Sequence, residues 1–121
     1  MFIEAMPKAN LQISGNLAGL VLAVLNDAPL HGYGIAREIE AKSAEALSFG
    51  EGTLYPALKI LERDGFIVGG WDTTISNGPA RKVYEITPEG KEELARIRDA
   101  WFEYSRSVGL VFDAKPNIQP A

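Results

Sequence analysis

Apolar residues recur at helical spacing between Glu51 and Gly65. They fall at positions i, i+3, i+4 and i+7, which predicts one short helix with a single buried stripe. The stripe consists of Leu54, Ala57, Leu58 and Leu61. Gly65 marks the expected end, because glycine adopts the left-handed conformation common just past a helix without strain. Pro56 is expected in the first turn, where a missing N–H breaks no intrahelical bond.

The opposite face of this helix mixes a large aromatic side chain with hydroxyls and cations. Its members are Thr53, Tyr55, Pro56, Lys59 and Arg63. Such side chains can reach phosphates and base edges if the helix lies in a major groove of DNA. They also fit a core helix with an ordinary solvated side, and this helix alone does not decide between the two interpretations.

Two further helices are predicted upstream. Residues 16–26 are apolar on nearly every side, which is typical of a helix enclosed by other elements and therefore central in the core. After a turn and His31, a second amphipathic helix follows, with Ile35, Ala36 and Ile39 on its inner face and Arg37 pointing out.

Downstream of Gly65 the hydrophobic period changes from 3.6 to 2. Residues 66–72 and 81–86 are rich in β-branched and aromatic side chains, and a turn-rich segment containing Asn77-Gly78-Pro79 separates them. This pattern predicts a β-hairpin with a long tip. Because two strands are not stable alone in water, we expect the hairpin to pack against the helices.

A long last helix is predicted over residues 88–112, with Thr87 as its N-cap and Pro88 at its first position. Its apolar residues alternate at spacings of three and four, as in a heptad seam. These residues are Leu94, Ile97, Trp101, Tyr104 and Val108. The seam could pack on the chain's own first helix or on a second subunit. We favour the dimer because Trp101 and Phe102 add apolar area beyond one stripe, and we expect a flexible tail over 113–121.

Composition narrows the classes of protein. The 121 residues suffice for one domain, and 46% hydrophobic with 23% charged residues is an ordinary globular balance. There is no cysteine, and the N-terminal residues lack the pattern of a signal peptide. The longest apolar run, Leu17 to Leu25, is too short to cross a bilayer. We therefore expect a cytoplasmic protein without membrane contact.

The predicted order of helix, helix, helix and hairpin is that of a winged helix-turn-helix. The fold class is thus mainly α with a small β-hairpin: a head over residues 12–87 followed by a dimerisation helix. Arg81 and Lys82 begin the second strand, where a wing would need cations for phosphates. A solvated pair on an edge strand is the alternative. The net charge of −4 means that any DNA binding depends on a few placed cations.

Several segments together resemble the PadR family of transcription regulators. They are LHGYGI at 30–35, GTLYPALK at 52–59, LE at 61–62, DGFI at 64–67 and RKVYEITPEG at 81–90. The resemblance implies a homodimer built through the last helix, with the first helix contributing, that represses nearby genes from a double-stranded DNA operator. It places Thr53, Tyr55, Pro56 and Lys59 on the recognition helix, and Arg81 and Lys82 on the wing.

The resemblance also implies an effector site. In some short members a tryptophan of the last helix lines an apolar pore at the dimer interface and stacks on flat drug-like ligands, and Trp101 matches it. Phe102 and Tyr104 are candidates beside it for a planar hydrophobic effector. One departure is Ile60, which stands where many relatives carry a cation, so that Lys59 has less electrostatic help.

Two other classes of function are alternatives to DNA binding. A winged-helix module that binds protein is supported by the net acidity. An enzyme is disfavoured because His31 is the only histidine, no nucleophile has a base at a recognisable spacing, and no cluster of metal-ligating residues stands out. We therefore expect neither cofactor nor metal.

Overall fold

The structure, a computed structural model, describes residues 16–72 and 80–114. Its elements in chain order are α3 (Leu17–Asp27), β1 (Leu30–His31), α4 (Gly32–Lys42), α5 (Glu51–Arg63), β2 (Ile67–Asp72), β3 (Arg81–Ile86) and α6 (Pro88–Phe112). The predicted hairpin tip at 77–79, the first residues of the head at 12–15 and the tail beyond 114 lie outside the described residues.

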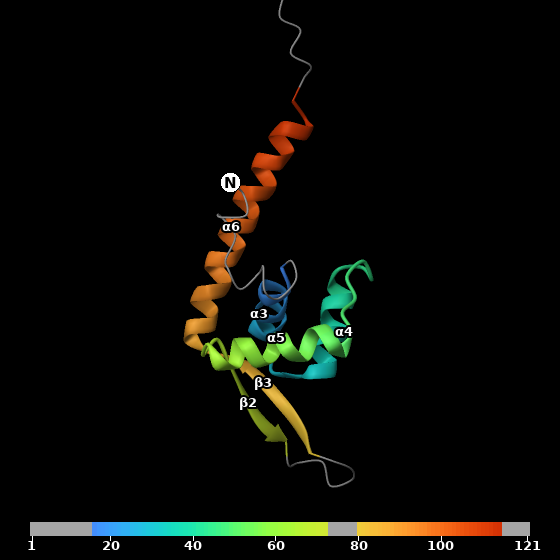
Figure 1. Cartoon of the computed structure of the whole chain (residues 1–121), viewed down its shortest axis with the longest axis vertical. Helices are drawn as coiled ribbons and strands as arrows, with labels where there is room; N and C mark the ends of the chain where they lie inside the picture. Colours follow the sequence, from blue (N-terminus) through green and yellow to red (C-terminus); the bar gives the residue numbers. More distant parts are fainter. Residues whose placement is uncertain (1–15, 73–79, 115–121) are drawn as a thin grey trace, which may run out of the picture.

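Helix α3 is the centre of the core, as its all-round apolar sequence predicted. Leu17, Ala18, Val21 and Leu22 are fully buried, and α3 contacts α4, α5, α6 and β3. Figure 1 shows α3 above α5, with α4 to one side and α6 to the other. The head is therefore built around one short helix, and α4, α5 and α6 each bury apolar surface against it.

Helix α5 has the predicted stripe and the predicted stop. Its buried residues are Leu54, Ala57, Leu58 and Leu61. Gly65 has φ of +81°, the left-handed conformation that glycine was expected to supply. The position predicted for Pro56 was wrong, because the helix begins at Glu51 and Pro56 therefore lies inside it, past the first turn. Its ring replaces the N–H that would have donated to the carbonyl of Gly52.

The sheet has three strands in the order β1-β3-β2, all antiparallel. Strands β2 and β3 form the predicted hairpin, which we call the wing, with a register that runs from Ile67 opposite Ile86 to Asp72 opposite Arg81. Strand β1 was not predicted. It is two residues long, and it adds Leu30 opposite Tyr84 and His31 opposite Val83, which ties the wing to the start of α4.

Helix α6 is divided between the core and the surface. Leu94 and Ile97 are 5% and 4% exposed and belong to the chain's own core beside α3. Trp101, by contrast, is 41% exposed, and the helix continues as a long projection beyond the head (Figure 1). The dimer prediction had placed Leu94 and Ile97 at a subunit interface, whereas here they pack within one chain; we call the remaining part of α6, residues 98–112, the arm.

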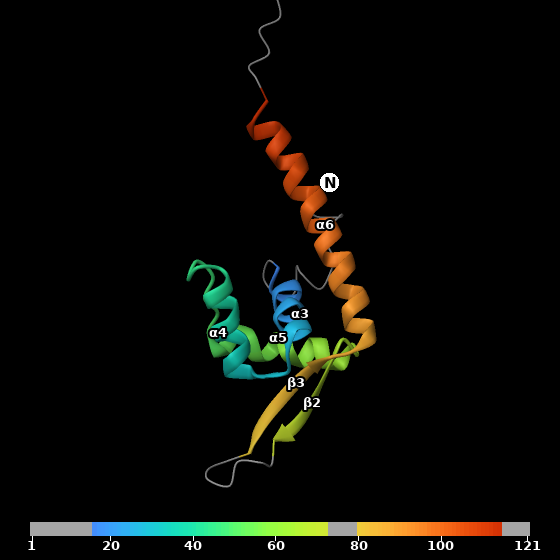
Figure 2. The ribbon, with the colours of Figure 1, turned by 180° about the vertical axis from the view of Figure 1, so that it is seen from behind.

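The start of α6 is fixed to the end of α5 by a small set of hydrogen bonds. The backbone N–H of Thr87 donates to the carbonyl of Phe66 at 3.1 Å, and its hydroxyl donates to the carbonyl of Gly65 at 2.7 Å. The same hydroxyl accepts from the N–H of Gly90 at 3.0 Å, which is the predicted N-cap. Seen from behind in Figure 2, wing and arm leave the head from the same end of α5.

Gly90 is needed for this junction because the backbone comes too close for a side chain. A Cβ atom at Gly90 would lie 2.0 Å from the carbonyl oxygen of Phe66. Gly90→Ala should therefore lower the free energy of unfolding by about 2 kcal/mol or more.

A matched control lies on the same helix. At Gly109 the nearest atom to an added Cβ is the Asp113 carboxylate at 4.0 Å. Gly109→Ala should raise stability by about 0.5 to 1 kcal/mol, the usual helix preference of alanine over glycine. Denaturant unfolding followed by circular dichroism measures both; equal stability of the two variants would contradict the close approach at Gly90.

Candidate nucleic-acid interface

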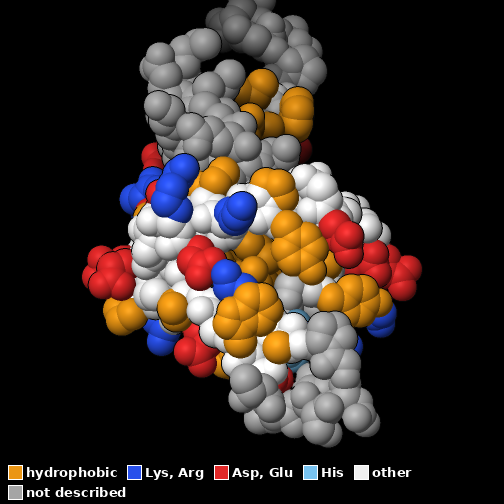
Figure 3. All heavy atoms as spheres, turned by 60° about the horizontal axis from the view of Figure 1, so that its bottom comes forward, with side chains coloured by type: hydrophobic (Ala, Val, Ile, Leu, Met, Phe, Trp, Pro, Cys, Tyr) orange, Lys and Arg blue, Asp and Glu red, His pale blue; other side chains and the backbone are white. Residues whose placement is uncertain are grey.

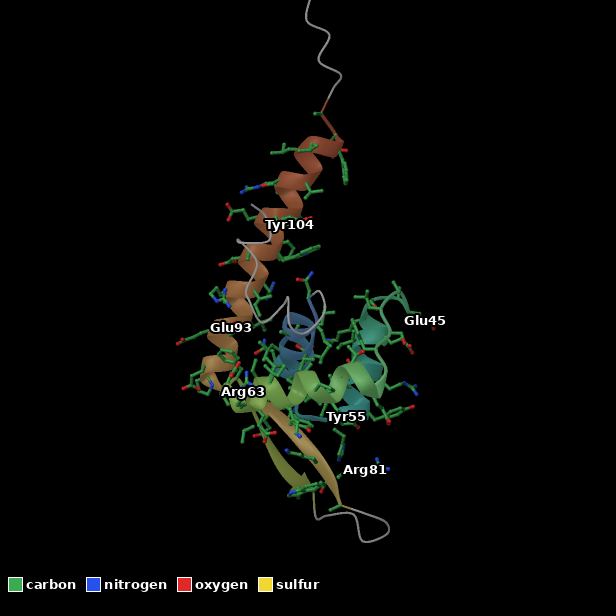
Figure 4. The ribbon with its side chains drawn as sticks, viewed as in Figure 1. Glu45, Tyr55, Arg63, Arg81, Glu93 and Tyr104 are labelled. Carbon is green, nitrogen blue, oxygen red and sulfur yellow. The ribbon has the colours of Figure 1, made fainter. Side chains whose placement is uncertain are left out.

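Helix α5 presents a set of side chains to solvent that we call the reading face. It consists of Thr53, Tyr55, Pro56 and Lys59, all exposed. The buried stripe of the same helix holds these side chains at a fixed orientation. In Figure 4, Tyr55 and Arg63 mark the two ends of α5, and Arg81 lies on the wing below Tyr55.

A hollow of about 360 Å³ separates the reading face from the wing. Its lining comes mainly from β1, α4, α5 and β3 and includes His31, Tyr33, Tyr55, Arg81, Lys82 and Tyr84. Gly32 lets the aromatic ring of Tyr55 lie against the start of α4, since an added Cβ would be 2.9 Å from that ring. The structure therefore brings Tyr55 and Arg81, which are distant in sequence, to the two sides of one hollow.

The two wing cations differ in their surroundings. Arg81 is exposed at the far end of β3. Lys82 is partly buried, and its Nζ donates to Glu62 Oε1 of α5 at 2.9 Å and lies 5.4 Å from the ring centroid of Tyr84. The hydrogen bond with Glu62 raises the pKa of Lys82, and burial raises the pKa of Tyr84. Lys82 is thus engaged within the protein, and Arg81 is the cation that the wing presents outward.

Two exposed residues of α4 were missed as site candidates. Arg37 donates to the hydroxyl of Tyr33 at 2.9 Å, and its guanidinium lies 5.6 Å from the centroid of that ring. This hydrogen bond raises the pKa of Arg37. An aromatic residue and an arginine four apart on a helix are neighbours on its surface, so this spacing was the available signal. The pair presents a cation and a hydroxyl on the exposed side of α4. Of the two residues, Tyr33 also lines the hollow.

His31 precedes α4 and has a structural environment. Its Nε2 is buried, lies 3.4 Å from Asp72 Oδ2 of the wing, and makes no hydrogen bond within the described residues. It connects β1 to the distal end of β2, in agreement with its interpretation as a structural residue. No metal-binding cluster of His, Cys, Asp or Glu occurs among residues 16–72 and 80–114.

The charge on this side of the molecule is mixed. Figure 3 shows hydrophobic side chains between separate Lys or Arg and Asp or Glu groups, without a continuous basic area. Any attraction for phosphates must therefore come from individual cations at set positions.

A second, apolar groove lies at the base of the arm. It has a volume of about 670 Å³ and is formed by α3, the segment before α5, and α6. Its lining includes Leu20, Ala23, Leu47, Phe49, Trp101 and Phe102. Trp101 and Phe102 thus share one groove. Tyr104 is outside its lining, with a ring centroid 6.2 Å from that of Trp101.

Residues 21–96 match the family model described as the transcriptional regulator PadR-like family. The chain belongs to this family. The members of this family are transcriptional regulators, and membership implies DNA-binding regulation. Within the described part of the chain, no helix of this PadR-like protein is long and apolar enough to span a membrane.

Individual relatives agree with the family model. Transcriptional regulator Rv3488 from Mycobacterium tuberculosis is 37% identical over 82 residues, which cover 68% of this chain and 72% of the relative. A transcriptional regulator from Clostridium thermocellum has a similar structure, with a TM-score of 0.72, 26% identity, and coverage of 83% of this chain and 94% of the other. A PadR-like transcriptional regulator from Bacillus cereus is similar as well, with a TM-score of 0.71 and 26% identity. The match covers 87% of this chain and 99% of the other.

Proposed function

We propose that this PadR-like protein is a homodimeric repressor that reads an inverted DNA repeat with one α5 helix per subunit. The observation that carries the proposal is the reading face of α5, which is exposed beside Arg81 while the opposite stripe of the helix is fixed in the core. Base edges specify a sequence, and phosphate contacts set the position of the protein on the duplex. The reading face supplies the first kind of contact and the wing supplies the second.

A second set of phosphate contacts comes from α4. Tyr33 lies at the start of α4 and lines the hollow opposite the wing, and Arg37, one turn further along α4, is hydrogen-bonded to it. With α5 in a major groove, Arg81 meets the backbone on one side of the helix and Arg37 meets it on the other. Two separated cations suit a protein of net charge −4, because position then replaces overall charge as the source of attraction.

The arm supports the dimer. Leu110, Val111 and Phe112 are 69%, 72% and 80% exposed on consecutive positions of one helix. Large apolar side chains gathered on a projecting helix lose contact with water when a second subunit covers them. A symmetric pair would place its two α5 helices about one helical turn, ~34 Å, apart on the DNA.

A winged-helix module that binds protein is the second candidate. The mixed charge of the wing side and the net charge of −4 favour it. Selection from a random duplex pool, followed by fluorescence anisotropy, separates the two candidates. We expect recovery of an inverted repeat; a folded, dimeric protein that recovers no sequence would favour the protein-binding module.

The salt dependence of binding tests the wing. Arg81→Ala should lower the slope of log K against log salt by about 0.9 for each phosphate contact removed per subunit. Arg106→Ala is the control, because Arg106 is an exposed cation of the arm. Equal slopes for Arg81→Ala and wild type would remove Arg81 from the interface.

The dimer is tested at the end of the arm. Phe112→Ser should weaken self-association by about tenfold or more, because a large apolar side chain contributes roughly 1.5 to 3 kcal/mol when it is fully buried. Val68→Ser is the control, since Val68 is an exposed apolar residue of the wing. Sedimentation equilibrium measures both, and a concentration-independent monomer in the wild type would refute the dimer.

The groove at Trp101 is the proposed effector site, where a planar aromatic ligand would stack on Trp101 and contact Phe102, with Tyr104 behind Trp101. Planar aromatic dyes should quench the tryptophan emission of the Trp71→Phe variant, in which Trp101 remains. They should not quench the emission of Trp101→Phe, in which only the exposed Trp71 remains. Quenching that follows Trp71 would contradict the site. Release of DNA further requires that the ligand bind one dimer geometry better than the other.

A further inference from the structure

One carboxylate connects the recognition helix to both strands of the wing. Glu62 lies in the last turn of α5. Its Oε1 accepts from Lys82 Nζ of β3 at 2.9 Å, and its Oε2 accepts from the backbone N–H of Gly69 of β2 at 3.3 Å. Both contacts are partly buried. We call this arrangement the Glu62 bridge.

The side chains of the bridge lie directly over Gly69, so that a side chain there would force Lys82 to move. A Cβ atom there would lie 2.3 Å from Lys82 Cε and 3.2 Å from Glu62 Oε2. The next residue is also a glycine, and a Cβ at Gly70 would meet no described atom within 4 Å. Of the two glycines, therefore, only Gly69 lies beneath the Lys82 and Glu62 side chains and has no room for a side chain of its own.

The charges of the bridge are unusual for a protein surface that approaches DNA. A glutamate near the duplex repels phosphates, so it weakens binding unless it has another role. Lys82 would attract phosphates, but its ammonium is paired with that glutamate. The pair therefore adds little net charge to the interface, and its contribution must come from geometry.

We propose that Glu62 is a positioning residue that fixes the wing at a set angle to α5, so that Arg81 and the reading face meet the DNA together. In this role Lys82 acts through Glu62 and not by contacting phosphate. The inference rests on the proposed DNA-binding function and assigns within it a residue that touches no DNA.

Positioning and charge have opposite effects on binding. Removal of Glu62 removes a negative charge, which should leave binding to random DNA unchanged or tighter. Removal of the bridge releases the wing, which should weaken binding only to the operator, since both contacts are then needed in one geometry. A variant that merely loses folded protein would lose both kinds of binding equally.

The experiment compares Glu62→Ala and Glu62→Gln with Glu85→Ala on two duplexes, the selected operator and a scrambled sequence. Glu85 is an exposed wing carboxylate without a hydrogen bond among the described residues, so it controls for charge. Glu62→Ala should weaken operator binding by roughly fivefold to twentyfold, because the wing is no longer held in the geometry that both DNA contacts need. The same variant should bind the scrambled duplex as tightly as the wild-type protein does, or more tightly.

Glu62→Gln removes the same charge but keeps an acceptor, so its operator affinity should lie between those of Glu62→Ala and wild type. Glu85→Ala should not weaken operator binding. Wild-type operator affinity retained in Glu62→Ala would overturn the positioning role alone. A wild-type protein that does not distinguish the two duplexes would overturn the proposed function, and the positioning role with it.

A second pair of variants tests the bridge without changing any charge. Gly69→Ala displaces Lys82 and Glu62, and it should reproduce the loss of operator binding seen in Glu62→Ala. Gly70→Ala adds the same methyl group one residue along the strand and should bind as wild type does. If both alanine variants bind the operator equally well, the bridge does not position the wing and the inference is wrong. If Lys82→Met lowers the salt slope as Arg81→Ala does, Lys82 contacts phosphate, which also overturns the inference.

Discussion

The structure depends on the close backbone contact at the end of α5. Gly65 turns the chain in the left-handed conformation, Phe66 and Gly65 offer their carbonyls to Thr87, and the absent side chain of Gly90 lets α6 approach. Helix α5, which carries the reading face, ends at this point, and the wing and α6, which carries the arm, begin there. Their relative orientation is therefore set by short-range hydrogen bonds and steric contact, which tolerate less variation than hydrophobic packing does.

Most of the fold could be predicted from sequence because the apolar residues of each long element recur at a single regular spacing. The stripe of α5, the enclosed α3 and the capped start of α6 each contain enough residues for their spacing to decide the structure. Strand β1 could not be found, because two residues have no measurable period and their partners, Val83 and Tyr84, are more than fifty residues away. Pro56 was misplaced because α5 begins earlier than a proline in the first turn would require.

The candidate site was predictable in part. The exposed residues of α5 follow directly from its buried stripe, so Tyr55 and Lys59 were placed correctly on the outer face. The difference between Arg81 and Lys82 was not predictable, since adjacent residues of a strand point to opposite faces and only the tertiary structure brings Glu62 beside one of them. The apolar period of α6 correctly predicted a long helix, but that period could not show where the head ends and the arm begins.

The arm is also a lever. Its fifteen residues from Arg98 to Phe112 extend about 22 Å at 1.5 Å per residue. At that length, a tilt of about 5° at the base of the arm displaces its far end by roughly 2 Å. Conversely, anything that holds the far end in place suppresses rotation of the head by the same ratio. Mechanical advantage would thus let weak contacts at the end of α6 set the direction in which α5 points.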